Sequence, residues 1–278
     1  MMNFTETAFT FECEKSRLTG ILAMPESAHA QGVLVIVGGP QYRVGSHRQF
    51  TLLSRNLASA GIPCMRFDYR GMGDSGGKLH MFEEVEEDIR AAVDAFFARC
   101  PQLEKIVLWG LCDAASAAIF YAHRDPRVNG LALANPWVRT PQGEAKTQLK
   151  HYYLSKITDP VLWRKLISGK FDFAGSFRGF FGSVSKAKLE APGNDQPLPE
   201  RMCADLERFK GKTLLILSGN DLVAREFEDT VKASPKWQGL LNSPKVLRRD
   251  LQDADHTFSS RLWRDQVAEW TCDWVNRL

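Results

Sequence analysis

The chain has 278 residues, of which 44% are hydrophobic and 25% charged, as is ordinary for a globular protein that buries a substantial core. Its net charge of +3 is small and its basic residues are scattered, which excludes nucleic acid as an expected partner. No apolar run is long enough to span a membrane, and the N-terminus lacks the features of a secretory signal, so we expect a cytoplasmic protein. The six cysteines include no close pair, which argues against disulfide, zinc and redox frameworks; we expect no metal and no other cofactor.

Segments typical of strands alternate with segments typical of helices from residue 32 onward. Six short, mainly aliphatic runs predict strands at Gly32–Val37, Ile62–Phe67, Ile106–Trp109, Val128–Ala134, Lys212–Leu217 and Lys245–Leu247. Helices are expected at about 46–60, at about 82–100, directly after residue 112 and at 260–278. Two earlier strands, Phe9–Cys13 and Leu18–Met24, form an antiparallel start. This pattern predicts an α/β fold with a mostly parallel central sheet and helices on both faces.

One stretch, residues 137–209, interrupts this alternation. It is rich in aromatic residues, contains helical pieces and has no strand signal. Because it lies between two strands of the sheet, we expect an inserted helical lid. Residues 1–136 and 210–278 then form the core.

A strand, a sharp turn and a helix follow one another around Cys112. Small residues stand two positions before and after it, Gly110 and Ala114, as a strained strand-to-helix turn requires. Such a nucleophile elbow exposes its central side chain at the sheet edge. The competing interpretation of Cys112 is a small core residue, so a catalytic role depends on an acid and a histidine elsewhere.

Asp221 and His256 are the expected acid and base. Each follows a predicted strand, so both should lie on loops at the same sheet edge as Cys112. Their order along the chain is nucleophile, acid, base, which suits this architecture. Asp253 and Asp255 are alternative acids, but a side chain so near to His256 in sequence reaches its ring with difficulty. Turn formation by Asp221 and helix capping by His256 are the competing structural roles.

These three residues could carry out the proton transfers that an acyl transfer needs. His256 takes the thiol proton, or holds a thiolate–imidazolium pair with Cys112, and Asp221 fixes the tautomer of the ring. A thiol ionises more readily than a hydroxyl, so it needs less activation than a serine.

An oxyanion hole needs two donors. The backbone amide of Asp113, at the start of the helix, is expected to be one of them. The loop after the strand at 32–37 should supply the other; Pro40 has no N–H, and Gln41 is favoured over Gly39. Further candidates for substrate contact are Gly39, Arg43, His47 and Trp137, with solvation or helix capping as the competing role of Arg43 and His47.

Two glycine-rich patterns suggest nucleotide binding and fail on context. Gly71–Gly76 fits the pattern GxGxxG, but several residues intervene before helical spacing begins, so a loop is favoured. Gly77-Lys78 resembles the end of a phosphate-binding loop, but Leu79 stands where a hydroxyl would hold the metal.

The chain resembles the α/β-hydrolases over nearly its whole length. The loop Asp68-Tyr-Arg-Gly-Met-Gly-Asp-Ser75 is similar to the Asp-x-Arg-Gly-x-Gly-x-Ser loop of many members. Three longer strings, Gly38–Phe50, Gly110–Ser116 and Asn135–Thr140, resemble the exosortase A system-associated hydrolases of type 1. This resemblance implies a bacterial cytoplasmic hydrolase linked to exosortase and exopolysaccharide systems. Cysteine in place of serine suits that family and is similar to the nucleophile of dienelactone hydrolases.

The expected function is therefore hydrolysis of an ester or thioester through an acyl-Cys112 intermediate. The expected partner is a small-molecule acyl substrate, free or carrier-bound, and the aromatic lid favours an apolar or ring-containing acyl group. Two alternatives stay open: an acyltransferase that uses the same triad, and a catalytically silent binding protein.

Overall fold

The structure is a computed structural model that describes residues 2–38, 41–138 and 196–278. Its contacts divide the chain into two units, Met1–Arg139 with Leu198–Leu278, and Thr140–Pro197. The elements described below all belong to the first unit. Most of the expected lid lies outside the described residues, so the lid stays a prediction. The helix α7 (Leu198–Arg208), within the range 137–209, belongs to the first unit.

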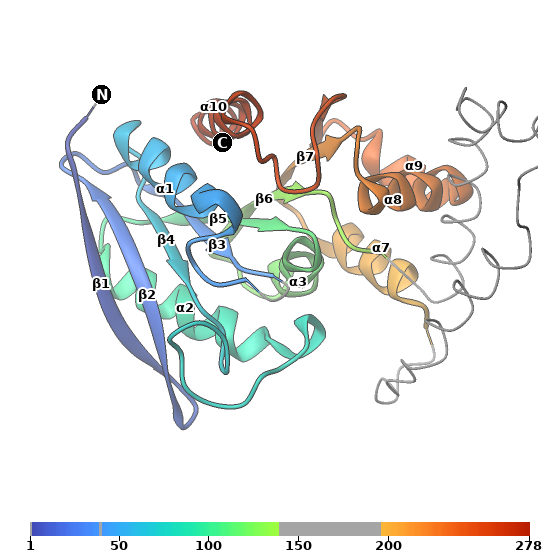
Figure 1. The fold of residues 1–278 in the computed structure, drawn as a ribbon. Coiled ribbons are helices and arrows are strands. Elements are labelled where there is room, and N and C mark those ends of the chain that lie inside the picture. The colour runs from blue at the N-terminus through green and yellow to red at the C-terminus, as the bar shows by residue number, and fades with distance from the viewer. Residues whose placement is uncertain (1, 39–40, 139–195) are drawn as a thin grey trace, which may run out of the picture. The chain divides into compact units, whose positions relative to one another are not determined.

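An eight-stranded sheet forms the centre of the first unit, in the order β1-β2-β4-β3-β5-β6-β7-β8 (Figure 1). Its strands are β1 (Phe4–Cys13), β2 (Ser16–Pro25), β3 (Gln31–Ile36), β4 (Cys64–Phe67), β5 (Lys105–Leu111), β6 (Val128–Ala134), β7 (Lys212–Ser218) and β8 (Val246–Leu251). Strand β2 runs antiparallel to both of its neighbours, and every other neighbouring pair is parallel. The mostly parallel sheet expected from the sequence is confirmed.

Helices cover both faces of this sheet. They are α1 (Gln49–Ser59), α2 (Glu86–Arg99), α3 (Asp113–Ala122), α7, α8 (Leu222–Ala233), α9 (Pro235–Leu241) and α10 (Arg261–Val275), with short 3₁₀ helices η1 (Ser46–Arg48) and η2 (Phe82–Glu84). Helices α1 and α10 lie on one side of the sheet, and α2 and α3 lie on the other (Figure 1).

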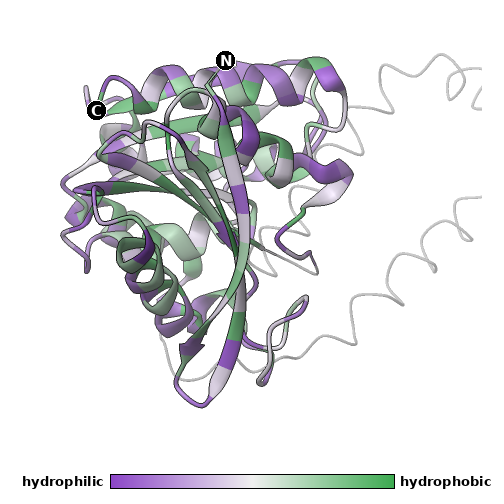
Figure 2. Ribbon diagram, turned by 90° about the vertical axis from the view of Figure 1, so that its left-hand side faces the viewer, coloured by the Kyte–Doolittle hydropathy of each residue, from purple (hydrophilic) through white to green (hydrophobic). Residues whose placement is uncertain are grey.

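Two hydrophobic clusters, one on each face, hold these layers together. Alternate residues of a strand enter opposite clusters: Leu34 packs with the cluster of α2 and α3, and Val33 and Val35 with that of α1 and α10. The strands in the middle of the sheet are largely hydrophobic, while the helices in view carry both hydrophilic and hydrophobic residues (Figure 2). A strand buried on both faces needs a continuous apolar run, which explains why such runs predict the sheet.

Several boundaries differ from the expected ones. The expected helix at 46–60 is a 3₁₀ turn followed by α1, because His47 and Arg48 have left-handed φ angles of 52° and 61°. Strand β1 begins at Phe4, and β8 continues to Leu251. Helices α8 and α9 were not expected. In α8 only Ala224, Glu226 and Phe227 are buried. None of the helices in the described parts of the chain is long and apolar enough to cross a membrane.

Candidate active site

Cys112 stands at the turn between β5 and α3 with backbone angles φ 63° and ψ −126°. A non-glycine residue in this region costs about 1–3 kcal/mol, and such strain persists only where the surroundings enforce it. A Cβ placed on Gly110 would lie 2.6 Å from backbone atoms of Ala114, so the turn closes only around a glycine. The elbow geometry expected from the small neighbours is therefore present.

Backbone hydrogen bonds hold Cys112 in this strained conformation. Its N–H donates to the carbonyl of Ala134 at 2.9 Å. Its carbonyl accepts from the N–H of Ala115 at 3.0 Å and from the N–H of Trp137 at 3.2 Å. Strand β5, helix α3 and the segment after β6 thus all fix the position of the half-buried thiol.

The structure brings Asp221 and His256 to this thiol from 109 and 144 positions along the chain (221 − 112 and 256 − 112). The Nδ1 atom of His256 lies 2.8 Å from Oδ2 of Asp221, and hydrogen bonding with the side chain of Cys112 contributes to the pKa of the ring. Asp221 is buried at 7% exposure and His256 is half-buried. His256 therefore lies between Asp221, the expected acid, and Cys112, the expected nucleophile.

The electrostatics of this chain favour a charged imidazole. Burial by itself disfavours the charge on His256, but the hydrogen bonds to Asp221 and Cys112, together with the negative charges there, raise its pKa to about 10 from an ordinary 6.5. The ring therefore keeps its proton at neutral pH.

Both roles considered for Asp221 are present at once. Its two carboxylate oxygens cap α8, accepting from the N–H groups of Val223 at 3.1 Å and Ala224 at 3.2 Å, while Oδ2 faces the ring of His256. The alternative acid Asp255 accepts instead from Thr257 and Ser259, which stabilises the turn after β8. Of these two carboxylates, the structure places Asp221 on the histidine.

The structure places one of the two expected donors of the oxyanion hole, the backbone amide of Asp113. Asp113 is the first residue of α3, so its N–H lies at the positive end of the helix beside Cys112. Gly38 packs closely against it: a Cβ on this glycine would lie 2.0 Å from Oδ1 of Asp113. Gln41 is half-buried, and its side-chain carbonyl accepts from the N–H of Ser46 at 3.2 Å. Gly39 lies outside the described residues, so the second donor stays a prediction.

Three expected substrate contacts have definite surroundings. The carbonyl of Trp137 accepts from Oγ of Ser116 at 2.6 Å, which places its backbone against the elbow. His47 is exposed. Burial opposes the charge on Asp255, but hydrogen bonds from Ser259 and Thr257 lower the pKa of this carboxyl, and the nearby His47 contributes to the lowering. The guanidinium of Arg43 is paired with Asp68 and Asp74, so its main visible role is to hold its own loop. Contact with substrate stays a prediction for all three.

Asp68 is a positioning residue to which sequence reasoning assigned no role of its own. Its fully buried carboxylate accepts from the backbone N–H of Arg43 at 2.6 Å, from the guanidinium of Arg43 and from the N–H of Asp74 at 3.1 Å. The loop that follows β3 is thereby tied to the loop that follows β4. A lone acid directly after a buried strand is the sequence signal that could have identified it.

We expect Asp68→Asn to destabilise the protein by about 3 kcal/mol or more, because it leaves the largely buried charge of Arg43 without its main partner. Denaturant unfolding measures this loss. The matched control is Asp74→Asn, which removes the other partner of Arg43. The side chain of Asp74 is 66% exposed, so this change should cost less than about 1 kcal/mol. Equal losses for the two variants would contradict the assignment.

The other five cysteines differ from Cys112 in their surroundings. Burial raises the pKa of Cys13, Cys100 and Cys272 to about 11 and that of Cys64 to about 12, and it also raises the pKa of Cys203. Such thiols stay protonated and unreactive at neutral pH.

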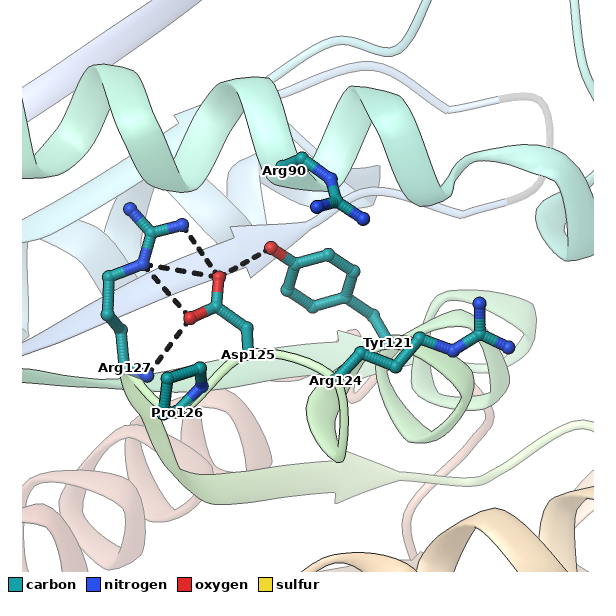
Figure 3. Close-up of a pocket in the computed structure, with 6 residues that line it drawn as sticks. All are labelled: Arg90, Tyr121, Arg124, Asp125, Pro126 and Arg127. Carbon is teal, nitrogen blue, oxygen red and sulfur yellow. Dashed lines mark hydrogen bonds and ion pairs between the residues drawn. The ribbon is translucent and has the colours of Figure 1, made fainter.

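A cavity of about 260 Å³ lies away from this site, at the end of α3 (Figure 3). Its lining residues are Arg90, Tyr121, Arg124, Asp125, Pro126 and Arg127. Arg127 is paired with Asp125, and Arg90 and Arg124 share the carboxylate of Glu86. Each arginine already has a carboxylate partner, so we assign this cavity no part in the reaction. In the described ranges, no group of three or more His, Cys, Asp or Glu side chains is arranged to hold a metal ion.

Solved structures with this fold resemble the chain along almost its full length. An esterase from Pyrococcus furiosus aligns with a TM-score of 0.66 and 16% identity, over 99% of this chain and 93% of that one. A dienelactone hydrolase from Anabaena variabilis aligns with a TM-score of 0.61 and 17% identity, over 99% and 98%. An alpha-beta serine hydrolase homologue from Coxiella burnetii gives 0.58 and 16%, over 97% of both chains. At these identities the likeness establishes the α/β-hydrolase fold. No curated protein matches the sequence.

A family model matches residues 28–178, which is more than half of the chain and includes Cys112. The family is described as serine aminopeptidase, S33, whereas here a cysteine occupies the elbow. With the sheet order, the elbow and the match together, this chain belongs to the α/β-hydrolase family described as serine aminopeptidase, S33.

Proposed function

We propose that the protein is a hydrolase of esters or thioesters that works through an acyl-Cys112 intermediate. The observation that carries this proposal is the ring of His256, which bonds both the carboxylate of Asp221 and the thiol held in the strained elbow. A charged imidazole beside the sulfur provides a thiolate for attack. It also provides a proton for the leaving group.

The reaction has two steps. The thiolate of Cys112 attacks the acyl carbon, the oxyanion is stabilised by the N–H of Asp113 with Gln41 as the proposed second donor, and His256 protonates the leaving alcohol or thiol. Water then attacks the thioester; His256, now neutral, accepts its proton, and the thiolate leaves. Asp221 stays ionised throughout and stabilises the imidazolium.

Thiol chemistry and the structures that share the fold support this choice of substrate class. A thiolate exchanges readily with thioesters and attacks activated esters, and structures that share the fold include an esterase and a dienelactone hydrolase. The resemblance of Gly38–Phe50 and Asn135–Thr140 to exosortase-associated hydrolases supports a cytoplasmic role beside exopolysaccharide systems, with a free or carrier-bound acyl group as substrate. Because the matching family is described as serine aminopeptidase, aminoacyl amides must be tested as substrates beside esters and thioesters.

Intact-protein mass spectrometry tests this proposal. The wild-type protein is incubated with aryl esters, acyl thioesters and aminoacyl anilides, and Cys112→Ala serves as the control. We expect a stoichiometric acyl adduct that maps to Cys112, turns over with esters or thioesters and is absent from the variant. Faster release of the adduct by an added alcohol or amine would instead indicate an acyltransferase. An intact fold with neither adduct nor turnover on any of these substrates would count against the proposal.

A further inference from the structure

The residue after β6, Asn135, connects the segments that carry the proposed nucleophile and base. It is fully buried and has a left-handed φ of 44°, which asparagine tolerates better than most residues. Its neighbours on the same segment hold the elbow, since the carbonyl of Ala134 and the N–H of Trp137 both bond the backbone of Cys112. Its own side chain bonds the backbone of His256, the proposed base.

The amide of Asn135 has all of its bonding groups engaged. Its Oδ1 accepts from the N–H of Ser218 at 2.9 Å, which fixes the orientation of the amide because only an oxygen can accept there. Its Nδ2 donates to Oγ of Ser218 at 2.9 Å and to the carbonyl of His256 at 3.0 Å. The hydroxyl of Ser218 in turn donates to the carbonyl of Asp255 at 2.9 Å.

This network fixes the backbone on which the base stands. Ser218 is the last residue of β7 and is 3% exposed, and Asn135 directly follows β6, so both members of the pair stand at the ends of neighbouring strands of the sheet. They hold two successive carbonyls, those of Asp255 and His256, in a loop that lacks regular secondary structure. A buried polar network that is fully satisfied makes a local conformation unique.

We propose that Asn135 and Ser218 are positioning residues that set the distance between the ring of His256 and the thiol of Cys112. The inference rests on the proposed function in that Cys112 and His256 are taken as the reacting pair. The ring of His256 is placed on one side by Asp221 and on the other by its own backbone, which Asn135 holds. Loss of the backbone anchor lets the ring move away from the sulfur while the acid stays in place.

The test uses Ser218→Ala, which removes one hydroxyl and leaves the amide of Asn135 bonded to the carbonyl of His256 and to the N–H of residue 218. Asn135→Ala is the stronger variant. The matched control is Thr271→Val, since Thr271 is fully buried and its hydroxyl donates to the carbonyl of Val267 at 2.7 Å in α10. It removes an equally buried hydroxyl from a helix that carries none of the triad.

Two measurements need no substrate: the NMR titration of the His256 ring, and the rate at which iodoacetamide alkylates Cys112. For Ser218→Ala we expect alkylation at pH 7 to slow by about tenfold and the ring to lose its proton at lower pH than in the wild type, with Thr271→Val unchanged. Where substrate turns over, kcat should fall by a similar factor with KM unchanged. Asn135→Ala should show the same changes, larger in size.

Ser218→Ala with an unchanged ring titration and an unchanged alkylation rate would overturn the inference, as would an equal effect of Thr271→Val. If Asn135→Ala does not fold, Ser218→Ala decides alone, and its thermal unfolding shows that the fold is retained. If the wild-type protein hydrolyses no ester or thioester, the proposed function is refuted. If Ser218→Ala still shifts the titration of the His256 ring and slows the alkylation of Cys112, the positioning role stands.

Discussion

Replacement of Cys112 by alanine is expected to lower kcat/KM for ester or thioester hydrolysis by about 10⁴-fold or more, because it removes the group that we propose forms the acyl intermediate. Stability should change by less than about 1 kcal/mol, since alanine fits the same elbow and no hydrogen bond of the backbone is lost. Progress curves on the substrate selected by adduct formation measure the first effect. Thermal unfolding measures the second.

Alkylation gives a matched control within the same chain. Iodoacetamide at pH 7 should modify Cys112 selectively in the folded protein, because burial raises the pKa of Cys13 and Cys100 to about 11 and that of Cys64 to about 12. Activity should fall in step with the modification of this one thiol. If peptide mapping finds another cysteine modified with the same loss of activity, Cys112 is not the nucleophile.

Cys112→Ser tests whether the reaction needs a thiol or only a nucleophile placed at the elbow. A hydroxyl at the elbow occupies the same place but does not ionise beside His256 at neutral pH, so we expect alkylation to be lost and turnover to fall well below that of the wild type. Wild-type turnover by this variant would show that the reaction does not depend on a thiolate.

The second large effect is expected for Asp221→Asn. The asparagine carbonyl oxygen still caps α8, but the carboxylate that pairs with Nδ1 of His256 is gone. We expect the pKa of His256 to fall from about 10 toward 6.5 by about 1 to 3 units and kcat to fall by about 10³-fold, because an amide presents a donor where the ring needs an acceptor. NMR titration of the ring and a pH–rate profile report the two changes.

The direction of the pH dependence follows from the raised pKa. In the folded protein the ring of His256 stays charged up to about pH 10, whereas a histidine with the ordinary value of 6.5 loses its proton earlier. The stability that the charged ring contributes is therefore complete below about pH 6.5 and is lost as the pH rises through about 10. Activity that needs the imidazolium should decline over the same alkaline range, and in Asp221→Asn the decline should begin at lower pH.

Ser234→Ala is the control for the capping role of Asp221. Ser234 caps the neighbouring helix α9 by accepting from the N–H of Trp237, and it is not part of the proposed triad. Its loss should cost about 1 kcal/mol of stability and leave the titration of His256 unchanged. If this variant lowered kcat as far as Asp221→Asn does, the effect of Asp221 would be that of a helix cap.

The sequence by itself determined the features that depend on neighbouring residues. The elbow at Cys112 could be predicted because its strain is local: small residues at Gly110 and Ala114 are a steric condition within five positions. The buried strands could be predicted because a strand covered on both faces needs a continuous apolar run, as in β3 and β7. The candidates Asp221 and His256 followed from the rule that loops at one sheet edge meet.

Only the tertiary structure decided which distant groups make contact. The sequence favoured Asp221 over Asp255 as the acid only by their spacing from His256, and it is the packing of the loop after β7 against the loop after β8 that brings Asp221 to the histidine. The same holds for the bond of Asn135 to the carbonyl of His256, which joins residues 121 positions apart. Hydrogen bonds between such distant segments have no periodicity along the chain, so no pattern in the sequence records them.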